Sequence, residues 1–186
     1  IVPATTAADI DRLEALAGWH DAAPVMHEPF RQWVIEDDFV GGRRPDLAAA
    51  GAQMVAEVTP FELMKLRMLN GTHSALAYLG YLAGHETIAQ AMADPVLAAF
   101  TRRLWRDEIM PVVAPPPGED LAAYAAALAA RYANPAIRHR TWQIAMDGSQ
   151  KLPQRILGTV ADDLAAGRPV PGLALATAAW MTYVSG

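Results

Sequence analysis

The chain lacks cysteine, which excludes disulfides, thiol nucleophiles and cysteine-bound zinc. It also lacks an excess of positive charge, because its formal net charge is −5, so we expect no nucleic-acid partner. Its longest weakly polar stretch, 172–184, is shorter than the roughly 20 residues that a membrane-spanning helix needs. We therefore expect no membrane partner either.

The common motifs for nucleotides and metals are missing as well. There is no G-x-G-x-x-G after a strand and no Walker loop, so the sequence predicts no nucleotide-binding turn. The five histidines are scattered and no H-E-x-x-H occurs. We therefore predict no metal site.

What the sequence has in abundance is material for helices. Hydrophobic residues make up 53% of the 186 residues, charged residues only 19%, and alanine, the best helix former, occurs 38 times. The pattern predicts an all-α fold without an internal boundary, with a short two-stranded element near 31–36 and 53–58. The predicted helices cover 7–17, 59–83, 86–92, 94–108, 119–132, 134–147, 149–166 and 171–184.

The clearest local signal is the start of the second helix. Thr59 suits the N-cap, Pro60 the first helical position, and Glu62 completes a capping box. The same logic predicts Asp94 as the cap before Pro95, and Ser149 as the cap of a later helix.

Lysine is scarce, which makes its positions informative. Only Lys65 and Lys151 occur, against 13 arginines among the 15 basic residues. Lysine can lose its proton when it is desolvated, whereas arginine cannot. The two lysines either serve proton-transfer chemistry or are the remainder of a strong arginine bias.

The residues around Lys65 place four polar side chains on one broad side of a helix. At about 100° per residue, Asn70 lies about 140° and His73 about 80° from Lys65, with Glu62 about 60° to the other side. An amine can move a proton, while an amide and an imidazole can donate hydrogen bonds to a developing oxyanion. The spacing fits equally well a capping glutamate, a bend at Asn70-Gly71 and a core histidine.

Three blocks of the sequence resemble the mannitol dehydrogenase family, the long-chain polyol-specific dehydrogenases. Block 62–84 carries a lysine, an asparagine five residues later and a histidine three further on, as in the signature helix of that family. Block 27–39 agrees with the family, and block 134–155 is most similar to its fructuronate reductase (mannonate oxidoreductase) branch.

The resemblance implies that residues 1–186 form a C-terminal helical substrate-binding and catalytic domain, similar to that of 6-phosphogluconate dehydrogenase. The N-terminal Rossmann domain of the family, on which this one docks and which holds NAD or NADP, is then absent from the chain. The isolated chain is expected to be inactive, with self-association covering its docking face.

The implied activity is that of a cytoplasmic, metal-independent secondary-alcohol dehydrogenase acting on a polyol or hexuronate, with D-mannonate and D-fructuronate as the expected pair. Mannitol 2-dehydrogenase (mannitol and fructose) and arabinitol dehydrogenase are the alternatives within the family. A non-catalytic helical module for oligomerisation or binding is the alternative of another class.

By the family pattern, Lys65 is the general base in oxidation and the general acid in reduction. Asn70 and His73 bind the reacting oxygen, and Glu62 relays the proton to solvent. Lys151 is a second cation that holds a substrate hydroxyl or carboxylate.

Other residues are candidates for holding the substrate. Arg138, His139 and Arg140 can grip a hexuronate carboxylate, or they can form an ordinary solvated face. Trp33 and Glu36 can line the cleft, or they can be a packed tryptophan and a solvent-facing acid.

Overall fold

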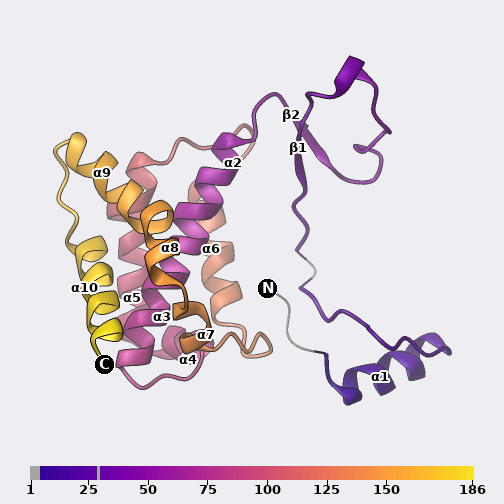
Figure 1. Ribbon diagram of the computed structural model, residues 1–186, viewed down its shortest axis with the longest axis horizontal. Coiled ribbons are helices and arrows are strands. Elements are labelled where there is room, and N and C mark those ends of the chain that lie inside the picture. The colour runs from indigo at the N-terminus through magenta and orange to yellow at the C-terminus, as the bar shows by residue number, and fades with distance from the viewer. Residues whose placement is uncertain (1–4, 29) are drawn as a thin grey trace. The chain divides into compact units, whose positions relative to one another are not determined.

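The computed structural model describes residues 5–28 and 30–186 (Figure 1). The chain divides into two compact units, Ile1–Gln32 and Trp33–Gly186. Each unit is described by itself below. No helix within the described ranges is long and apolar enough to cross a membrane.

The first unit contains the helix α1 (Ala7–Ala17). Thr6 caps its start in a capping box with Asp9, and Gly18 ends it in the left-handed conformation with a φ of 76°. The prediction of a helix over 7–17 that stops at Gly18 is confirmed. None of the residues of α1 is buried.

The second unit opens with a small parallel sheet. Strand β1 (Val34–Glu36) pairs with β2 (Gln53–Val55), with Ile35 opposite Met54. The short 3₁₀ turn η1 (Val40–Gly42) lies in the connection between the strands. The predicted two-stranded element is therefore confirmed, and its strands are shorter than the predicted ranges.

The rest of the second unit is helical, which confirms the predicted fold class. Its elements are α2 (Thr59–Met64), η2 (Lys65–Gly71), α3 (Thr72–Leu82), α4 (Ile88–Ala93), α5 (Pro95–Leu104), η3 (Trp105–Ile109), η4 (Met110–Val112), α6 (Leu121–Tyr132), α7 (Thr141–Ala145), α8 (Gly148–Leu152), η5 (Pro153–Leu157), α9 (Gly158–Ala165) and α10 (Pro171–Ser185). As predicted, the Asp94 carboxylate caps the helix that begins at Pro95.

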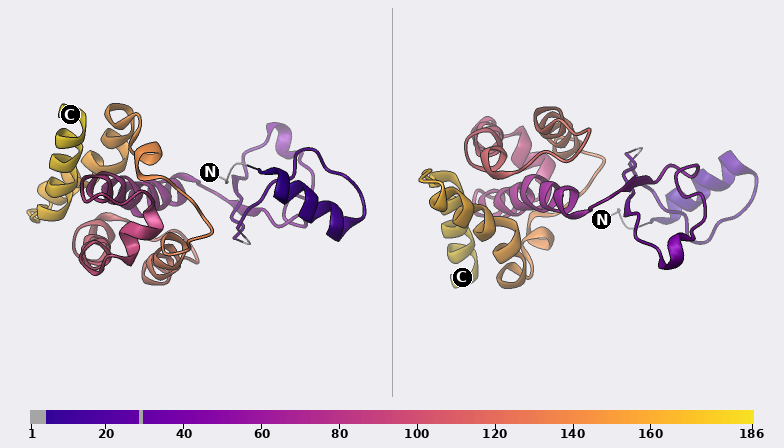
Figure 2. Two further views of the ribbon diagram at one scale, coloured as in Figure 1. Left: turned by 90° about the horizontal axis from the view of Figure 1, so that it is seen from below. Right: turned by 90° about the horizontal axis from the view of Figure 1, so that it is seen from above.

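Helix α3 is the central element of the helical unit. It packs against α4, α5, α7 and α10, and Figure 2 shows it between the other helices of this unit. Every residue from Thr72 to Tyr78 is buried, as expected for a helix that neighbours cover on all sides. Its largest buried neighbours in the core include Met64, Met68, Ile88, Leu104, Leu128, Leu152, Ile156 and Leu173.

The start of the long helix differs from the predicted capping box. The N-cap residue is Val58, and its side chain makes no capping hydrogen bond. Instead, Glu36 Oε2 accepts a hydrogen bond of 3.0 Å from the Val58 N–H. The capping box at Thr59 and Glu62 was wrong because a carboxylate from β1 satisfies the donor that an N3 glutamate would otherwise take.

The region 134–165 also departs from the predicted helices. Only Thr141–Ala145 is helical between 134 and 147, because the Ile88 N–H donates to His139 O and the Thr141 N–H to Glu86 O. These bonds tie 139–141 to 86–88, and 134–137 forms a turn closed by the Ile137 N–H on Asn134 O, so the helix predicted over 134–147 was wrong in its first half. The next helix begins at Gly148 without a side-chain cap, so the prediction of a cap at Ser149 was also wrong.

Candidate active site

Two of the predicted catalytic residues lie on a π-helical segment. Element η2 spans Lys65 to Gly71 between two α-helical segments of one continuous run. Because the π-helical hydrogen bond joins residues five apart, Lys65 and Asn70 are separated by one such turn. The α-helical estimate of about 140° between them therefore does not apply, and the wider turn brings the two residues towards one face.

Side chains from other helices hold the backbone of this π segment. The Trp105 Nε1–H donates to Met68 O at 2.8 Å, and the Thr72 hydroxyl donates to the same oxygen at 2.6 Å. The Tyr132 hydroxyl donates to Leu69 O at 2.6 Å. The segment therefore has its own set of buried donors, which satisfy carbonyls next to Asn70.

His73 lies one turn further along and is buried, at 7% exposure. Its ring stacks on Tyr132 with the centroids 5.2 Å apart and the planes 11° apart, and it lies 5.3 Å from the ring of His139. Burial, with the positive charges nearby, lowers the pKa of His73 to about 3. The imidazole is therefore neutral at neutral pH, so it carries one N–H donor and one acceptor.

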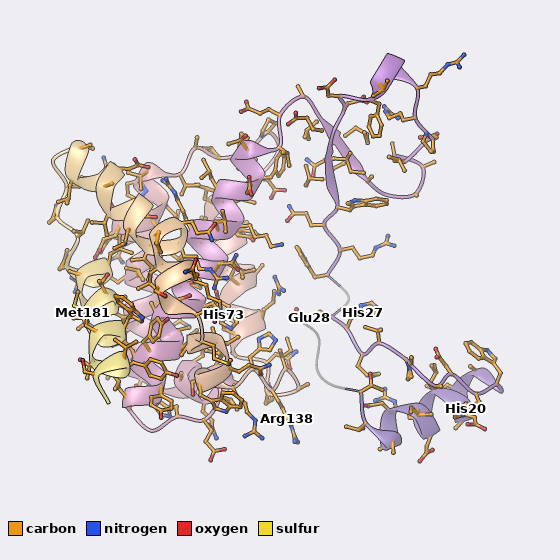
Figure 3. The ribbon with its side chains drawn as sticks, in the orientation of Figure 1. His20, His27, Glu28, His73, Arg138 and Met181 are labelled. Atoms are coloured by element: carbon orange, nitrogen blue, oxygen red, sulfur yellow. The ribbon has the colours of Figure 1, made fainter. Side chains whose placement is uncertain are left out.

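One nitrogen of this imidazole is ready for a ligand. His73 Nε2 is buried and has no hydrogen-bond partner among the described residues. Buried polar atoms in native proteins nearly always have a partner. An oxygen of a bound molecule would satisfy His73 Nε2 at this position. Figure 3 labels His73 among the helices of the second unit.

The predicted residues along this helical run, called the polar row below, are Glu62, Lys65, Asn70 and His73. The exposure of their side chains rises from His73 back to Glu62. Asn70 is partly buried, whereas Lys65 and Glu62 are exposed. Within the described residues no hydrogen bond or ion pair engages Lys65. The structure thus brings the predicted residues onto one helical run, but the described chain does not enclose the lysine.

Lys151 lies on α8, at some distance along the chain from the other candidates. Its Nζ donates to Met146 O at 2.5 Å and lies 3.7 Å from Asp147 Oδ2. Asp147 has a φ of 59°, the only positive value at a non-glycine residue in the described chain. The turn before α8 therefore folds back to hold the lysine amine.

Arg155, which the sequence did not single out, lies near His73. Its Nη1 donates to Ser74 Oγ at 3.3 Å, and its Nε is buried without a partner among the described residues. Burial lowers the pKa of this guanidinium. The sequence held no signal for Arg155, because its neighbour Ser74 is 81 residues away.

The predicted arginine cluster is split by the structure. The ring of His139 lies beside His73, whereas Arg138 and Arg140 line an open groove of about 490 Å3 with Glu86 and Gln90 on the side of α4. Arg138 is exposed at the edge of the unit (Figure 3). Only one of the three neighbours therefore faces the buried imidazole.

Trp33 and Glu36 have different surroundings. Glu36 is used by the Val58 N–H at the start of α2, and Trp33 is 53% exposed. Their contact with a substrate stays a prediction. No group of three metal-binding side chains is found in residues 5–28 and 30–186.

Comparison with known proteins gives one family. The mannitol dehydrogenase C-terminal domain model matches residues 57–186. Escherichia coli (strain K12) D-mannonate oxidoreductase is 53% identical over 186 residues, which are all of this chain and 38% of that protein. Mannitol dehydrogenase 2 of Saccharomyces cerevisiae is 42% identical over 173 residues, 91% of this chain and 34% of that protein. The chain thus spans little more than a third of these curated relatives.

Solved structures have the same fold. The ternary complex of Pseudomonas fluorescens mannitol 2-dehydrogenase with NAD and D-mannitol matches with a TM-score of 0.87 and 40% identity, over all of this chain and 38% of that one. Substrate-free D-sorbitol dehydrogenase matches with a TM-score of 0.91 and 33% identity, with the same coverage.

Proposed function

Since the chain belongs to the mannitol dehydrogenase C-terminal domain family, we propose that it is the substrate-binding and catalytic part of an NAD(P)-dependent oxidoreductase. The proposed reaction interconverts a sugar alcohol or hexonate with its keto form, with D-mannonate and D-fructuronate as the preferred pair. The 53% identity to D-mannonate oxidoreductase, against 42% to a yeast mannitol dehydrogenase, supports the acid over the polyol.

The observation that carries the proposal is the unpartnered Nε2 of His73 in the same helical run as Asn70 and Lys65. A neutral imidazole and an amide can hold the reacting oxygen by hydrogen bonds that strengthen as negative charge develops on it. Lys65 takes the hydroxyl proton in oxidation and returns it in reduction, and Glu62 passes it to solvent.

Lys65 needs a drier environment than this chain gives it. Desolvation favours the neutral amine that acts as a base, and the Lys65 side chain is exposed in this chain. We place the docking face for a Rossmann domain over the exposed end of the row, where that domain would exclude water from Lys65. The site is therefore complete only in the full enzyme, which we expect in the cytoplasm, where the two domains are docked.

The cofactor belongs to that second domain. The described residues contain no strand, glycine-rich turn and helix unit of the kind that holds a dinucleotide, so this chain offers no fit for NAD or NADP by itself. When bound in the complete enzyme, the nicotinamide supplies or accepts the hydride. We expect the isolated chain neither to bind NAD(P) nor to turn over substrate, and micromolar NAD binding in calorimetry would contradict this.

Substitution of Lys65 in the complete enzyme tests the proposal. Lys65→Ala should lower kcat for fructuronate reduction by about 10²- to 10⁴-fold, as expected for the loss of a general acid. Lys65→Arg is the matched control for charge, because arginine keeps the charge but cannot give up its proton. It should be nearly as inactive as Lys65→Ala. Near-normal turnover by either variant would refute the assignment.

A substrate panel on the wild-type enzyme then separates the candidates. D-mannonate oxidised with a higher kcat/KM than mannitol or arabinitol supports the preferred pair, and the reverse order supports a polyol dehydrogenase. If no polyol or hexonate is oxidised by the folded, complete protein, the non-catalytic module becomes the better description.

A further inference from the structure

Tyr132 at the end of α6 touches both halves of the buried part of the site. Its hydroxyl donates to Leu69 O at 2.6 Å, on the residue before Asn70, and lies 3.0 Å from the Thr72 hydroxyl, on the residue before His73. Its ring stacks on the imidazole of His73. One side chain thus contacts the carbonyl that precedes Asn70 and the ring of His73.

We propose that Tyr132 is a positioning residue of the active site, which fixes the π turn that presents Asn70 and the plane of the His73 ring. This inference rests on the proposed function. Tyr132 itself is buried, at 7% exposure, and acts through the two residues that would contact the substrate oxygen.

The π turn explains why such a residue is needed. A shift of the hydrogen-bond register from four to five residues leaves the carbonyls of the turn poorly satisfied, and π segments persist where other groups compensate. Here Trp105 and Thr72 serve Met68 O. The Tyr132 hydroxyl donates to Leu69 O at 2.6 Å, and the same oxygen accepts from the Thr72 N–H and, at 3.3 Å, from the Thr72 hydroxyl. Without the Tyr132 hydroxyl, Leu69 O keeps only the donors from Thr72, which belong to the same helical run, and loses the donor that ties the turn to α6. The turn can then relax towards α-helical register, which would shift Asn70 relative to His73.

The state of the hydroxyl fits this role. Burial raises the pKa of Tyr132, so the phenol keeps its proton and remains a donor throughout the physiological pH range. It contributes no titration of its own. The proposal therefore predicts a change in the rate of the chemical step without a new ionisation in the pH profile.

Tyr132→Phe in the complete enzyme removes the hydroxyl and keeps the stacking ring. We expect kcat to fall by about tenfold or more, since a misplacement of 1 Å can cost about 10²-fold, while KM for the substrate changes by less than about twofold. Tyr124→Phe is the matched control. It lies on the same helix with 9% exposure and has no hydrogen bond to the η2 carbonyls among the described residues. It should leave kcat within about twofold of the wild type.

Hydrogen exchange gives a readout that does not depend on activity. In Tyr132→Phe, the amides of residues 69–73 should exchange about tenfold faster than in Tyr124→Phe, because the local turn is less well held. If the wild-type enzyme proves inactive towards polyols and hexonates, the proposed function fails, and hydrogen exchange still tests the structural part of this inference.

The outcomes are distinct. A kcat loss and faster exchange confined to Tyr132→Phe support the positioning role. Equal effects in the two tyrosine variants, or normal kcat in Tyr132→Phe, would overturn it. If Tyr132→Phe does not fold, Thr72→Val removes the neighbouring hydroxyl of the same network and should lower kcat in the same way, and an unchanged kcat there would also overturn the proposal.

Discussion

The two ends of the polar row on the long helix differ in what the fold gives them. At one end, His73 is buried, stacked on the Tyr132 ring and held neutral. At the other end, the side chains of Lys65 and Glu62 are exposed. Under the proposed function, the difference separates an oxygen-binding end that this chain encloses from a proton-transfer end that it leaves open.

Holding an oxygen and moving a proton have different structural needs. Hydrogen-bond donors work best when they are preorganised, and the core around α3 provides this for His73. A base has to pass its proton on during the cycle, and in the proposed function Lys65 does so through Glu62 and not by its own contact with bulk water. The division between a buried and an exposed half is therefore what a domain completed by docking requires.

Gly71→Ala should disturb the buried end most strongly. A Cβ at this position would lie 2.5 Å from the backbone oxygen of Arg155, where the main chain cannot move aside cheaply. Overpacking of this kind typically costs about 1–3 kcal/mol, so the melting temperature of the complete enzyme and its kcat should both fall.

Gly158→Ala is the control for this substitution. Its Cβ would be 3.6 Å from the nearest backbone oxygen, that of Pro153, which is ordinary contact. Alanine is also the better helix former, so stability should be unchanged or slightly higher. Equal thermal unfolding of the two variants would show that η2 and η5 are not tightly packed at Gly71.

His73→Gln should reveal the cost of keeping the imidazole neutral. In the unfolded chain the ring takes up a proton below about pH 6.5, whereas burial keeps the pKa of the folded state at about 3. The contribution of this ring to the free energy of unfolding is thus fully present above pH 6.5. It falls by about 1.4 kcal/mol per pH unit as the pH drops through the window down to about 3.

The glutamine variant should lose stability less steeply than the wild type between pH 6 and 4, as measured by urea unfolding. Ser74→Ala, a change at the adjacent buried residue, should keep the wild-type slope because His73 is still present. Parallel curves for the wild type and His73→Gln would mean that the ring is protonated in the folded state and lies in a wetter environment than the structure shows.

The sequence could predict the row because its members are close along the chain. Lys65, Asn70 and His73 share one helical run, so spacing and family pattern were enough to select them. The partners that hold the row are remote: Tyr132 is 63 residues from Leu69, and Trp105 is 37 residues from Met68. No local pattern links such pairs, so they could be found only from the fold.

Some elements were also beyond local rules. The π register of η2 has no signal of its own in the sequence, so the angles of an α-helical wheel do not apply between Lys65 and Asn70. At Thr59 the capping signal was correct in type, but the Glu36 carboxylate competed successfully for the same end of the helix. At 139–141 the chain pairs with 86–88, which outweighed the helical start expected from Asn134-Pro135.

The smallest expected effect concerns Arg138, and it tests whether the exposed rim contributes to specificity. Arg138 lies in the groove beside α4, whereas its neighbour His139 faces His73. An exposed guanidinium that pairs with a substrate carboxylate should be worth no more than about fivefold in KM. Arg138→Ala should therefore raise KM for D-mannonate by that amount or less and leave KM for mannitol unchanged. Arg102→Ala, at an exposed arginine of α5 outside that groove, is the control and should change neither KM. A rise in KM of tenfold or more for D-mannonate alone would mean that the groove beside α4 closes over the substrate. The contrast between the buried end and the exposed end of the polar row would then hold only for the domain without its partner.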